Sequence, residues 1–497
     1  MRALPNYKVA VPPGPKGHFL IGNLPMLGGN VLATLEGWAR EFGDIFSSRA
    51  FSVCVCYLTH PRFIEDVLVS RNQNFIKGVG TRVNPRLFGQ GLITSEGELW
   101  RRQRRLMQPA FHRRQIGLYG RVIVECTQKM LASWQAGEVR NLHSELDHLT
   151  LEIVARVLFN FDLTNHFGEL EAMARAVHAR TVRGPALVYA MRYLPIPVNV
   201  RYFWTVSRLD KVIYHVIRDR QASGRPGDDL LSMLLQARDE NGQAMSERQV
   251  RDELMTLIGA GNDTTTLTLC YAWYLLAKHP EVEAQLLAEL DEVLGDRLPD
   301  VEDLPRLIYI GKIIKESLRL YPPVWAFVRE ATEPFEIGGY RLPARTNFVL
   351  VPWIVHRDPR FFDQPQEFRP ERWTEDFERQ LPKFAYFPFG GGQRTCIGTA
   401  LAKMQTSLML ATMAQRFLCR LTRGFELELR PTITLQPKLG IPVVIKGRLS
   451  KRPRPAEAKL SSPGCHDECA SLQTAIAAGR WSLLGPWFRW RKRIPIA

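Results

Sequence analysis

The longest helical segment in the sequence places the strongest constraint on the fold. It runs from Ser246 to about His279, and Ser246 and Gln249 have the spacing of a capping box, in which side chains satisfy N–H groups of the first turn. Pro280 ends the run, because the residue before a proline rarely stays helical. A helix of this length spans about 50 Å and crosses a whole domain, so the other elements have to pack around it.

The centre of this helix, LIGAGNDTTTLTL at residues 257–269, is rich in residues that favour helices weakly. One interior glycine already costs about 1 kcal/mol relative to alanine. A strong helix with a weak centre is typical of a functional site, where small residues admit a bound species and where Asp263 and Thr264 could relay protons. Two alternatives stay open. One is a buried kink, and the other is a membrane span, since residues 254–277 lack Lys and Arg, although Asp263 at mid-span argues against it.

A second constraint comes from FPFGGGQRTCIG at residues 387–398, where a lone cysteine lies between three glycines and a helix start. The glycines predict a turn with unusual dihedral angles, and a sulfur at a helix N-terminus is stabilised as a thiolate. Cys396 could therefore be a nucleophile, a metal ligand or a buried thiol. A nucleophile needs a base such as His356, and zinc needs a second nearby ligand that the segment lacks, whereas a single thiolate suits haem iron.

Several arginines could bind carboxylates or phosphates, because a guanidinium group matches these anions in a bidentate manner. The candidates are Arg104, which shares a helix face with Trp100, and Arg329 and Arg394. Glu316 and Arg319 have the i, i+3 spacing of a helical ion pair. A basic helix face is usually solvated, and an exposed ion pair contributes less than about 1 kcal/mol, so neither pattern identifies a site alone.

The rest of the sequence predicts a mainly helical chain with a minor set of strands. Helices are expected at 98–125, 142–160 and 165–190, a proline-broken apolar loop at 194–203, and strands within 45–70, in a Gly-Gly hairpin at 335–351 and at 425–447.

Charge and cysteine content bear on the setting of the protein. The net charge of +16 favours an acidic partner, a nucleic acid or an anionic membrane surface without choosing among them. Eight scattered cysteines and a start without a long apolar run predict a reducing, cytoplasmic setting with no signal peptide or N-terminal anchor. Residues 448–497 are basic and show no core pattern until their end, so we expect a flexible extension after a domain at 1–447.

Taken together, these segments resemble the cytochrome P-450 family of haem-thiolate monooxygenases. FGGGQRTCIG at 389–398 matches the family's haem-loop signature F-x-x-G-x-R-x-C-x-G at every fixed position. The other matching segments are AGNDTT at 260–265 for the oxygen-binding helix, ESLR at 316–319 for the E-x-x-R pair, FRPERW at 368–373 for its partner loop, and WRRQR at 100–104 for the helix that meets a haem propionate. The resemblance covers roughly residues 10–447 and implies the P-450 fold, mainly α with minor β, in which a long central helix lies over a haem.

The resemblance implies a role for each matched position. Cys396 would be the axial ligand of the iron in haem b, with Phe389 shielding the sulfur. Asp263 and Thr264 would deliver protons to dioxygen, and Gly261 would leave room for it. The remaining assignments are Trp100, Arg104, Arg329 and Arg394 to the haem propionates, Gly398 to the haem loop, and Glu316, Arg319 and Arg372 or Arg369 to the core around that loop.

The resemblance also implies a reaction. The protein would insert one oxygen atom from O2 into a lipophilic substrate, by hydroxylation or epoxidation of a fatty acid, terpenoid, steroid or polyketide. Substrate contacts would fall at 79–92, 182–188, 257–260 and 324–328, which are mostly apolar. Electrons would come from NAD(P)H through a ferredoxin and its reductase or a flavodoxin, because no such module is fused to the chain. No nucleic acid and no transmembrane anchor are expected.

Two other functions remain alternatives: a haem-thiolate isomerase, dehydratase or peroxygenase, and a non-catalytic haem sensor or carrier. Neither needs a proton-delivery pair, so the presence of Asp263 and Thr264 favours the monooxygenase. In the extension, CHDEC at 465–469 could bind metal, and the aromatic and basic segment at 481–493 could contact an anionic membrane peripherally. A flexible tail without either role is the plainer alternative.

Overall fold

The structure is a computed structural model, and the parts of the chain that it describes are long and nearly continuous. It describes residues 11–78, 85–159, 196–224 and 229–448, with separate residues at 168–170, 172–173, 176–177, 194 and 227. The predicted substrate segment at 182–188, most of the helix expected at 165–190 and the extension at 449–497, including CHDEC, lie outside the described residues. One compact unit ends at Arg448. The division into a domain at 1–447 and a flexible extension stays a prediction.

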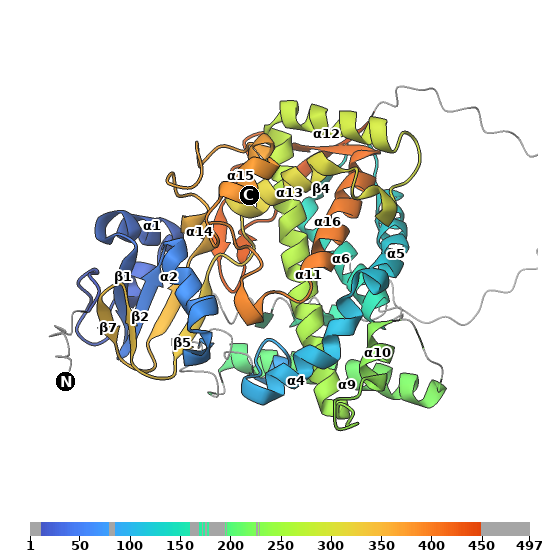
Figure 1. Cartoon of the computed structure of the whole chain (residues 1–497). Coiled ribbons are helices and arrows are strands. Elements are labelled where there is room, and N and C mark those ends of the chain that lie inside the picture. The colour runs from blue at the N-terminus through green and yellow to red at the C-terminus, as the bar shows by residue number, and fades with distance from the viewer. Residues whose placement is uncertain are drawn as a thin grey trace, which may run out of the picture. The chain divides into compact units, whose positions relative to one another are not determined.

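Helices dominate the described residues, as the sequence predicts, and they surround α11, Glu247–Lys278 (Figure 1). The predicted capping box is present, because Ser246 Oγ accepts the Gln249 N–H at 3.2 Å and Gln249 Oε1 accepts the Ser246 N–H at 2.9 Å. α11 continues through its weak centre without a break, and the kink alternative stays a prediction. Among the described helices, α11 included, none is long and apolar enough to span a membrane.

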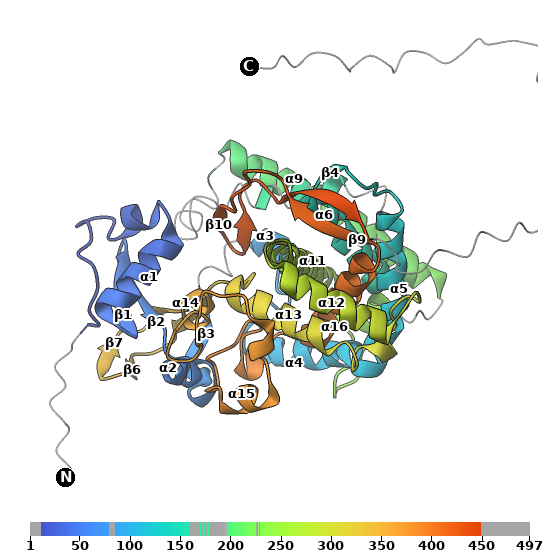
Figure 2. The same ribbon diagram turned by 90° about the horizontal axis from the view of Figure 1, so that it is seen from above.

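The helices that pack on α11 come from distant parts of the sequence. Figure 2 looks nearly along α11 and shows α6, α12, α13 and α16 grouped around it. Besides α11, the helices of the described residues are α1 (Val31–Phe42), α2 (Pro61–Glu65), α3 (Pro85–Phe88), α4 (Gly97–Met107), α5 (Arg113–Leu131), α6 (Leu142–Phe159), α9 (Pro197–Ser223), α10 (Leu230–Gln236), α12 (Pro280–Val293), α13 (Ile308–Leu320), α14 (Pro352–Val355), α15 (Glu375–Gln380) and α16 (Thr399–Ala414).

A five-stranded sheet lies beside the helices together with α1 and α2 (Figure 1). Its order is β1-β2-β8-β5-β3, and β2 pairs with β8 in parallel, with Val55 opposite Asn347. The other pairs in this sheet are antiparallel. Its strands are β1 (Ile45–Ala50), β2 (Val53–Leu58), β3 (Phe75–Lys77), β5 (Phe327–Ala331) and β8 (Asn347–Leu350).

The remaining described strands form small sheets. β6 and β7 make the predicted Gly-Gly hairpin, and Gly338 and Gly339 both have positive φ, 55° and 84°, as a tight hairpin turn requires. β10 and β11 form a second hairpin, which we call the 429–437 hairpin. These strands are β4 (Val139–Asn141), β6 (Phe335–Ile337), β7 (Tyr340–Leu342), β9 (Phe417–Leu421), β10 (Leu429–Pro431), β11 (Leu435–Pro437) and β12 (Pro442–Gly447).

Two helix predictions are wrong in detail. The loop expected at 194–203 is instead the start of α9, which begins at Pro197, because proline is well tolerated in the first turn, where its missing N–H has no helical partner to lose. The single helix expected at 98–125 is two helices, since Pro109 lies in the short turn that separates α4 from α5.

Candidate functional site

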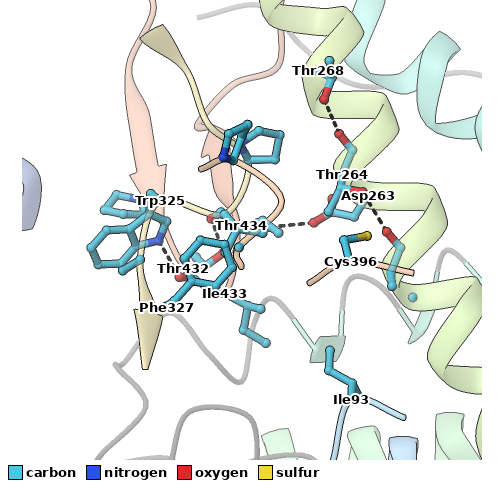
Figure 3. Close-up of a pocket in the computed structure, with 18 of the residues that line it drawn as sticks. Ile93, Asp263, Thr264, Thr268, Trp325, Phe327, Cys396, Thr432, Ile433 and Thr434 are labelled. Atoms are coloured by element: carbon cyan, nitrogen blue, oxygen red, sulfur yellow. Dashed lines mark hydrogen bonds between the residues drawn. The ribbon is translucent and has the colours of Figure 1, made fainter. Parts of the chain in front are cut away.

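A large cavity lies between α11, the loop that carries Cys396 and the 429–437 hairpin (Figure 3). Its volume is about 2560 Å³, and apolar side chains such as Val154, Leu257 and Phe327 line much of it. The predicted site residues in its wall are Gly261, Asp263, Thr264, Arg329, Phe389, Arg394, Cys396 and Gly398. One cavity therefore joins residues of two separate motifs with Arg329.

The Cys396 loop has a shape that only glycine permits. The Cys396 N–H donates to the Phe389 carbonyl at 3.0 Å and closes the loop. Gly390 and Gly392 have positive φ, 69° and 66°. A Cβ on Gly392 would lie 1.9 Å from the Leu68 carbonyl oxygen, so a side chain there would collide with the backbone.

The Cys396 sulfur is accessible from the cavity, whereas the other described cysteines are buried or half-buried. Dense protein around it raises the pKa of the Cys396 thiol, while the Gly398 N–H, the Thr399 hydroxyl and the Arg104 guanidinium act in the opposite direction. A coordinated metal ion deprotonates a thiol outright, so an iron at this position would supply the missing stabilisation of the thiolate.

Cations gather at one side of this loop. Arg394 pairs with Glu96, donates to the Ser95 carbonyl at 2.9 Å and lies 4.0 Å from the ring centroid of Trp100. Arg104, one turn further along α4, donates to the Thr395 carbonyl at 2.9 Å. Trp100 and Arg104 thus hold the loop from α4, although neither residue is in the cavity wall.

Arg329 lies in β5 and is held mainly by the backbone. Burial, followed by the charge of Arg394, lowers the pKa of Arg329 to about 10, and Glu96 opposes this shift. Its guanidinium donates to the Val328 carbonyl at 3.0 Å. A buried guanidinium of this kind is costly unless an anion approaches it.

Lys77 is a site residue that sequence reasoning missed. It lies opposite Arg329 in the β3–β5 pair, and its ammonium donates to the Leu92 and Ile93 carbonyls at 3.1 and 2.6 Å. Burial and the charges of Arg394 and Arg329 lower the pKa of Lys77 to about 7. No local motif marks Lys77, because only the pairing of two distant strands brings it to the cavity.

The residues present fit a haem. In the described cluster of Lys77, Arg329 and Arg394, the Arg394 side chain pairs with the carboxylate of Glu96, and Lys77 reaches that carboxylate only through its backbone N–H. The cluster therefore retains positive charge that two propionates would neutralise. An accessible sulfur lies in the wall of the same cavity. An iron porphyrin needs a thiolate for the iron, cations for the propionates and a large apolar space for the ring, and this cavity provides all three.

Asp263 and Thr264 lie on the α11 side of the cavity (Figure 3). The Thr264 hydroxyl donates to the Ala260 carbonyl at 2.7 Å, one turn back in the helix. Asp263 accepts hydrogen bonds from Thr434 at 2.6 Å and from Gln436 at 2.8 Å. Sequence reasoning missed both of these partners, which lie in the 429–437 hairpin.

Glu316 and Arg319 are fully buried, so the alternative of an ordinary surface pair is wrong. Arg319 also donates to the carbonyls of His356, Pro365 and Glu367. Arg372 Nε donates to Glu316 at 2.9 Å, whereas Arg369 reaches Glu316 only through its backbone N–H. Of the two arginines expected as side-chain partners, it is Arg372 that makes the ion pair.

The predicted substrate segments are partly at the cavity. Residues 257–260 and 324–328 line it, and of the segment 79–92 the described residues Leu87 and Phe88 do so. Ile433, at the tip of the 429–437 hairpin, also lines the cavity and was not predicted.

Comparisons with known proteins agree with this geometry. The family model described as Cytochrome P450 matches residues 12–442. Curated relatives include cyclooctatin synthase of Streptomyces melanosporofaciens, 36% identical over 79% of this chain and 86% of that protein. The cyclooctat-9-en-7-ol 5-monooxygenase of the same organism is 35% identical over 82% of this chain and 90% of that protein. Pentalenene oxygenase of Streptomyces avermitilis is 34% identical over 78% of this chain and 86% of that protein. The crystal structure of the cytochrome P450DA heme domain, 27% identical, superposes with a TM-score of 0.81 over 89% of this chain and 99% of that one.

Proposed function

Because the chain belongs to the cytochrome P450 family of haem b monooxygenases, we propose that it hydroxylates or epoxidises a cyclic terpenoid, with electrons from NAD(P)H passed on by a separate ferredoxin and its reductase. The observation that carries the proposal is that Asp263, Thr264 and Cys396 line one cavity (Figure 3). A proton donor and a metal ligand on one cavity are what O2 reduction at a metal requires. An isomerase or a haem carrier would have no use for the donor.

In this proposal Cys396 ligates the iron, and the Gly398 N–H stabilises its sulfur. Phe389 would shield the sulfur, and Gly261 would leave room for dioxygen beside α11, since both residues line the cavity. The anchors for the propionates would be Lys77, Arg329 and Arg394 in the cavity wall, and Trp100 and Arg104 would support them from α4. When bound, the haem supplies the iron at which O2 is activated.

The chain's own residues would then supply protons and exclude bulk water. Asp263 provides a carboxyl that exchanges a proton, and the Thr264 hydroxyl both donates and accepts. The apolar wall around Leu257 and Phe327 limits water near the reacting carbon. Protons should therefore arrive mainly through the Asp263–Thr264 pair.

The terpenoid assignment is supported by the relatives and by the apolar wall. Two relatives are named for pentalenene and cyclooctat-9-en-7-ol, by their names an alkene and an unsaturated alcohol without a carboxylate. Val324, Trp325 and Phe327 form an apolar wall that suits a substrate without a carboxylate. The cavity is also lined by cations outside the expected propionate site, namely Arg345, Lys403, Arg430 and Lys438, so the binding screen has to include a fatty acid.

A binding screen of the haem-loaded protein tests this assignment. Pentalenene, cyclooctat-9-en-7-ol and palmitic acid are each titrated while the haem absorption spectrum is followed for the spin-state shift that substrate causes. We expect the first two to produce a saturable shift. A shift with palmitic acid alone would overturn the terpenoid assignment and leave the monooxygenase activity intact.

The ferredoxin proposal is supported by charge near Cys396. The outer side of α4 carries Arg101 and Arg105, whose side chains are 55% and 62% exposed, although each also pairs with a carboxylate, Glu98 or Glu240. Arg104 of the same helix is bonded to Thr395, next to Cys396. An acidic ferredoxin docked on α4 would therefore stand close to the metal ligand.

Charge reversal tests the docking face. Arg105→Glu should slow ferredoxin-supported NADPH oxidation and flatten its salt dependence, because steering by exposed charges is screened by salt. Arg341→Glu, on the distant strand β7 and 54% exposed, is the matched control. Equal effects of the two variants would argue for a general charge effect and against this face.

A further inference from the structure

The 429–437 hairpin reaches α11 at the proposed proton donor. We propose that Thr434 and Gln436 are positioning residues that hold the Asp263 carboxyl and allow it to exchange its proton without moving. This inference rests on the proposed function of Asp263 and adds two residues that no family motif marks.

The described hydrogen bonds around Asp263 join three side chains. Thr434 Oγ1 donates to Oδ2 at 2.6 Å, and Gln436 Nε2 donates to Oδ1 at 2.8 Å. Gln436 Nε2 also donates to Thr434 Oγ1 at 2.8 Å. Each carboxyl oxygen of Asp263 therefore has a described donor.

The two partners differ in what they can do when Asp263 takes up a proton. A side-chain NH2 group can only donate, so Gln436 fixes Oδ1 as an acceptor. A hydroxyl both donates and accepts, so the Thr434 hydrogen can rotate away and let Oδ2 carry the proton while the heavy atoms stay in place. The carboxyl is thus held in both protonation states, and its proton enters and leaves at Oδ2.

The hairpin is well supported for such a role. Thr434 and Gln436 are 6% and 7% exposed. The Tyr271 hydroxyl of α11 donates to the Leu435 carbonyl, between the two residues, and the Leu435 N–H donates to the Pro323 carbonyl at 2.9 Å. Trp325 Nε1 donates to the Thr432 carbonyl at 3.0 Å (Figure 3). Partners held in this way are preorganised, which is what accurate positioning of a catalytic group needs.

The first test uses stability alone. Asp263→Ala, Thr434→Val and the double variant of the haem-loaded protein are compared by thermal unfolding. We expect the double variant to shift the midpoint by clearly less than the two single shifts combined, because both remove the same contact. Strict additivity would overturn the contact on which the proposal rests.

The second test reads proton delivery and needs neither substrate nor ferredoxin. Haem-loaded protein is reduced with dithionite and mixed with oxygenated buffer, and the return of the oxidised spectrum is timed in H2O and in D2O. Thr434→Val should change the rate and the H2O/D2O ratio, by roughly tenfold in rate. Thr434→Ser, which keeps the hydroxyl, should restore both. Gln436→Leu should change them less, because Oδ1 does not exchange the proton.

Thr432→Val is the matched control, since Thr432 lies in the same hairpin and its hydroxyl donates to the Thr434 carbonyl at 3.0 Å rather than to Asp263. Its rate and isotope ratio should stay at wild-type values. If Asp263→Asn alters the isotope ratio while Thr434→Val does not, the positioning role is wrong and the proposed function stands. If Asp263→Asn also leaves it unchanged, the proton-donor role of Asp263 itself fails.

Discussion

The Cys396 loop and the 429–437 hairpin reach the same cavity, yet they are built in different ways. The loop depends on glycines at positions where a side chain would strike the backbone, such as Gly392 against the Leu68 carbonyl. The hairpin depends on ordinary residues held by long-range hydrogen bonds, such as Thr434 to Asp263. The cysteine side tolerates few residue types, whereas many residues could form the hairpin's backbone.

This difference suggests that the Cys396 loop carries the chemistry common to the family and that the hairpin side carries the properties of the individual protein. A metal ligand has to stand at one place, so the residues around Cys396 are set by steric need. In the proposed function the hairpin and the apolar wall would meet the substrate, and substrate shape varies. Changes on the cysteine side should therefore abolish the protein's chemistry, and changes on the hairpin side should tune it.

The largest effect is expected from Cys396→Ser. Without the thiolate, the reduced protein with carbon monoxide should lose the red-shifted Soret band of a thiolate-bound haem, and NADPH-dependent product should disappear. Absorbance spectroscopy measures the first and product analysis the second. Cys54→Ser, at a half-buried cysteine in β2, should keep the band. A normal band in Cys396→Ser would contradict the ligand assignment.

Glu316→Gln should come next. The change leaves Arg319, which is fully buried, and Arg372 without their shared carboxylate, so we expect a loss of about 3–5 kcal/mol in the free energy of unfolding. Denaturant unfolding measures it. Glu378→Gln removes an ion pair whose glutamate is 42% exposed and should cost less than about 1 kcal/mol. Similar losses of unfolding free energy in Glu316→Gln and Glu378→Gln would mean that burial of the ion pair adds little to stability.

Lys77→Met should change the pH dependence of the haem-free protein. The pKa of Lys77 is lowered to about 7 in the fold, against about 10.4 for an unfolded lysine. Between these values the unfolded chain binds the extra proton, so the free energy of unfolding of the wild type should rise from pH 7 toward pH 10.

The contribution of Lys77 is isolated by the difference between the two proteins, because other groups titrate in both. The free energy of unfolding of the wild type minus that of Lys77→Met, measured with urea, should rise from pH 7 toward pH 10. This rise should vanish in the haem-loaded protein, where propionates would keep Lys77 charged. A flat difference in the haem-free protein would contradict the lowered pKa of Lys77.

The smallest effect is expected on the hairpin side. Ile433 is 42% exposed and lines the cavity, so Ile433→Ala should weaken pentalenene binding by about tenfold while leaving unfolding nearly unchanged. The spin-state titration measures the affinity. Leu439→Ala, at a residue 75% exposed beyond the hairpin, is the control. A loss of the thiolate band in Ile433→Ala would break the contrast between the two sides.

The sequence predicted the parts of the site whose local chemistry is restrictive. Gly392 and Cys396 could be recognised because a tight turn and a helix start leave few choices, and the long helix could be recognised from Ser246 and Gln249 at its start. The role proposed for Lys77 could not, since it follows from pairing β3 with β5, whose partners lie far apart in sequence. Nothing local distinguishes the threonine that reaches Asp263.

The parallel pair of β2 and β8 has a consequence for how the chain folds. Val55 meets Asn347, so the centre of the five-stranded sheet cannot form until most of the protein has left the ribosome. Until then the edge of β2 that pairs with β8 stays unpaired, and contacts between residues so far apart in the sequence form slowly. Slower synthesis lengthens this exposure, so a chaperone that covers the exposed edge should raise the yield of correctly assembled protein.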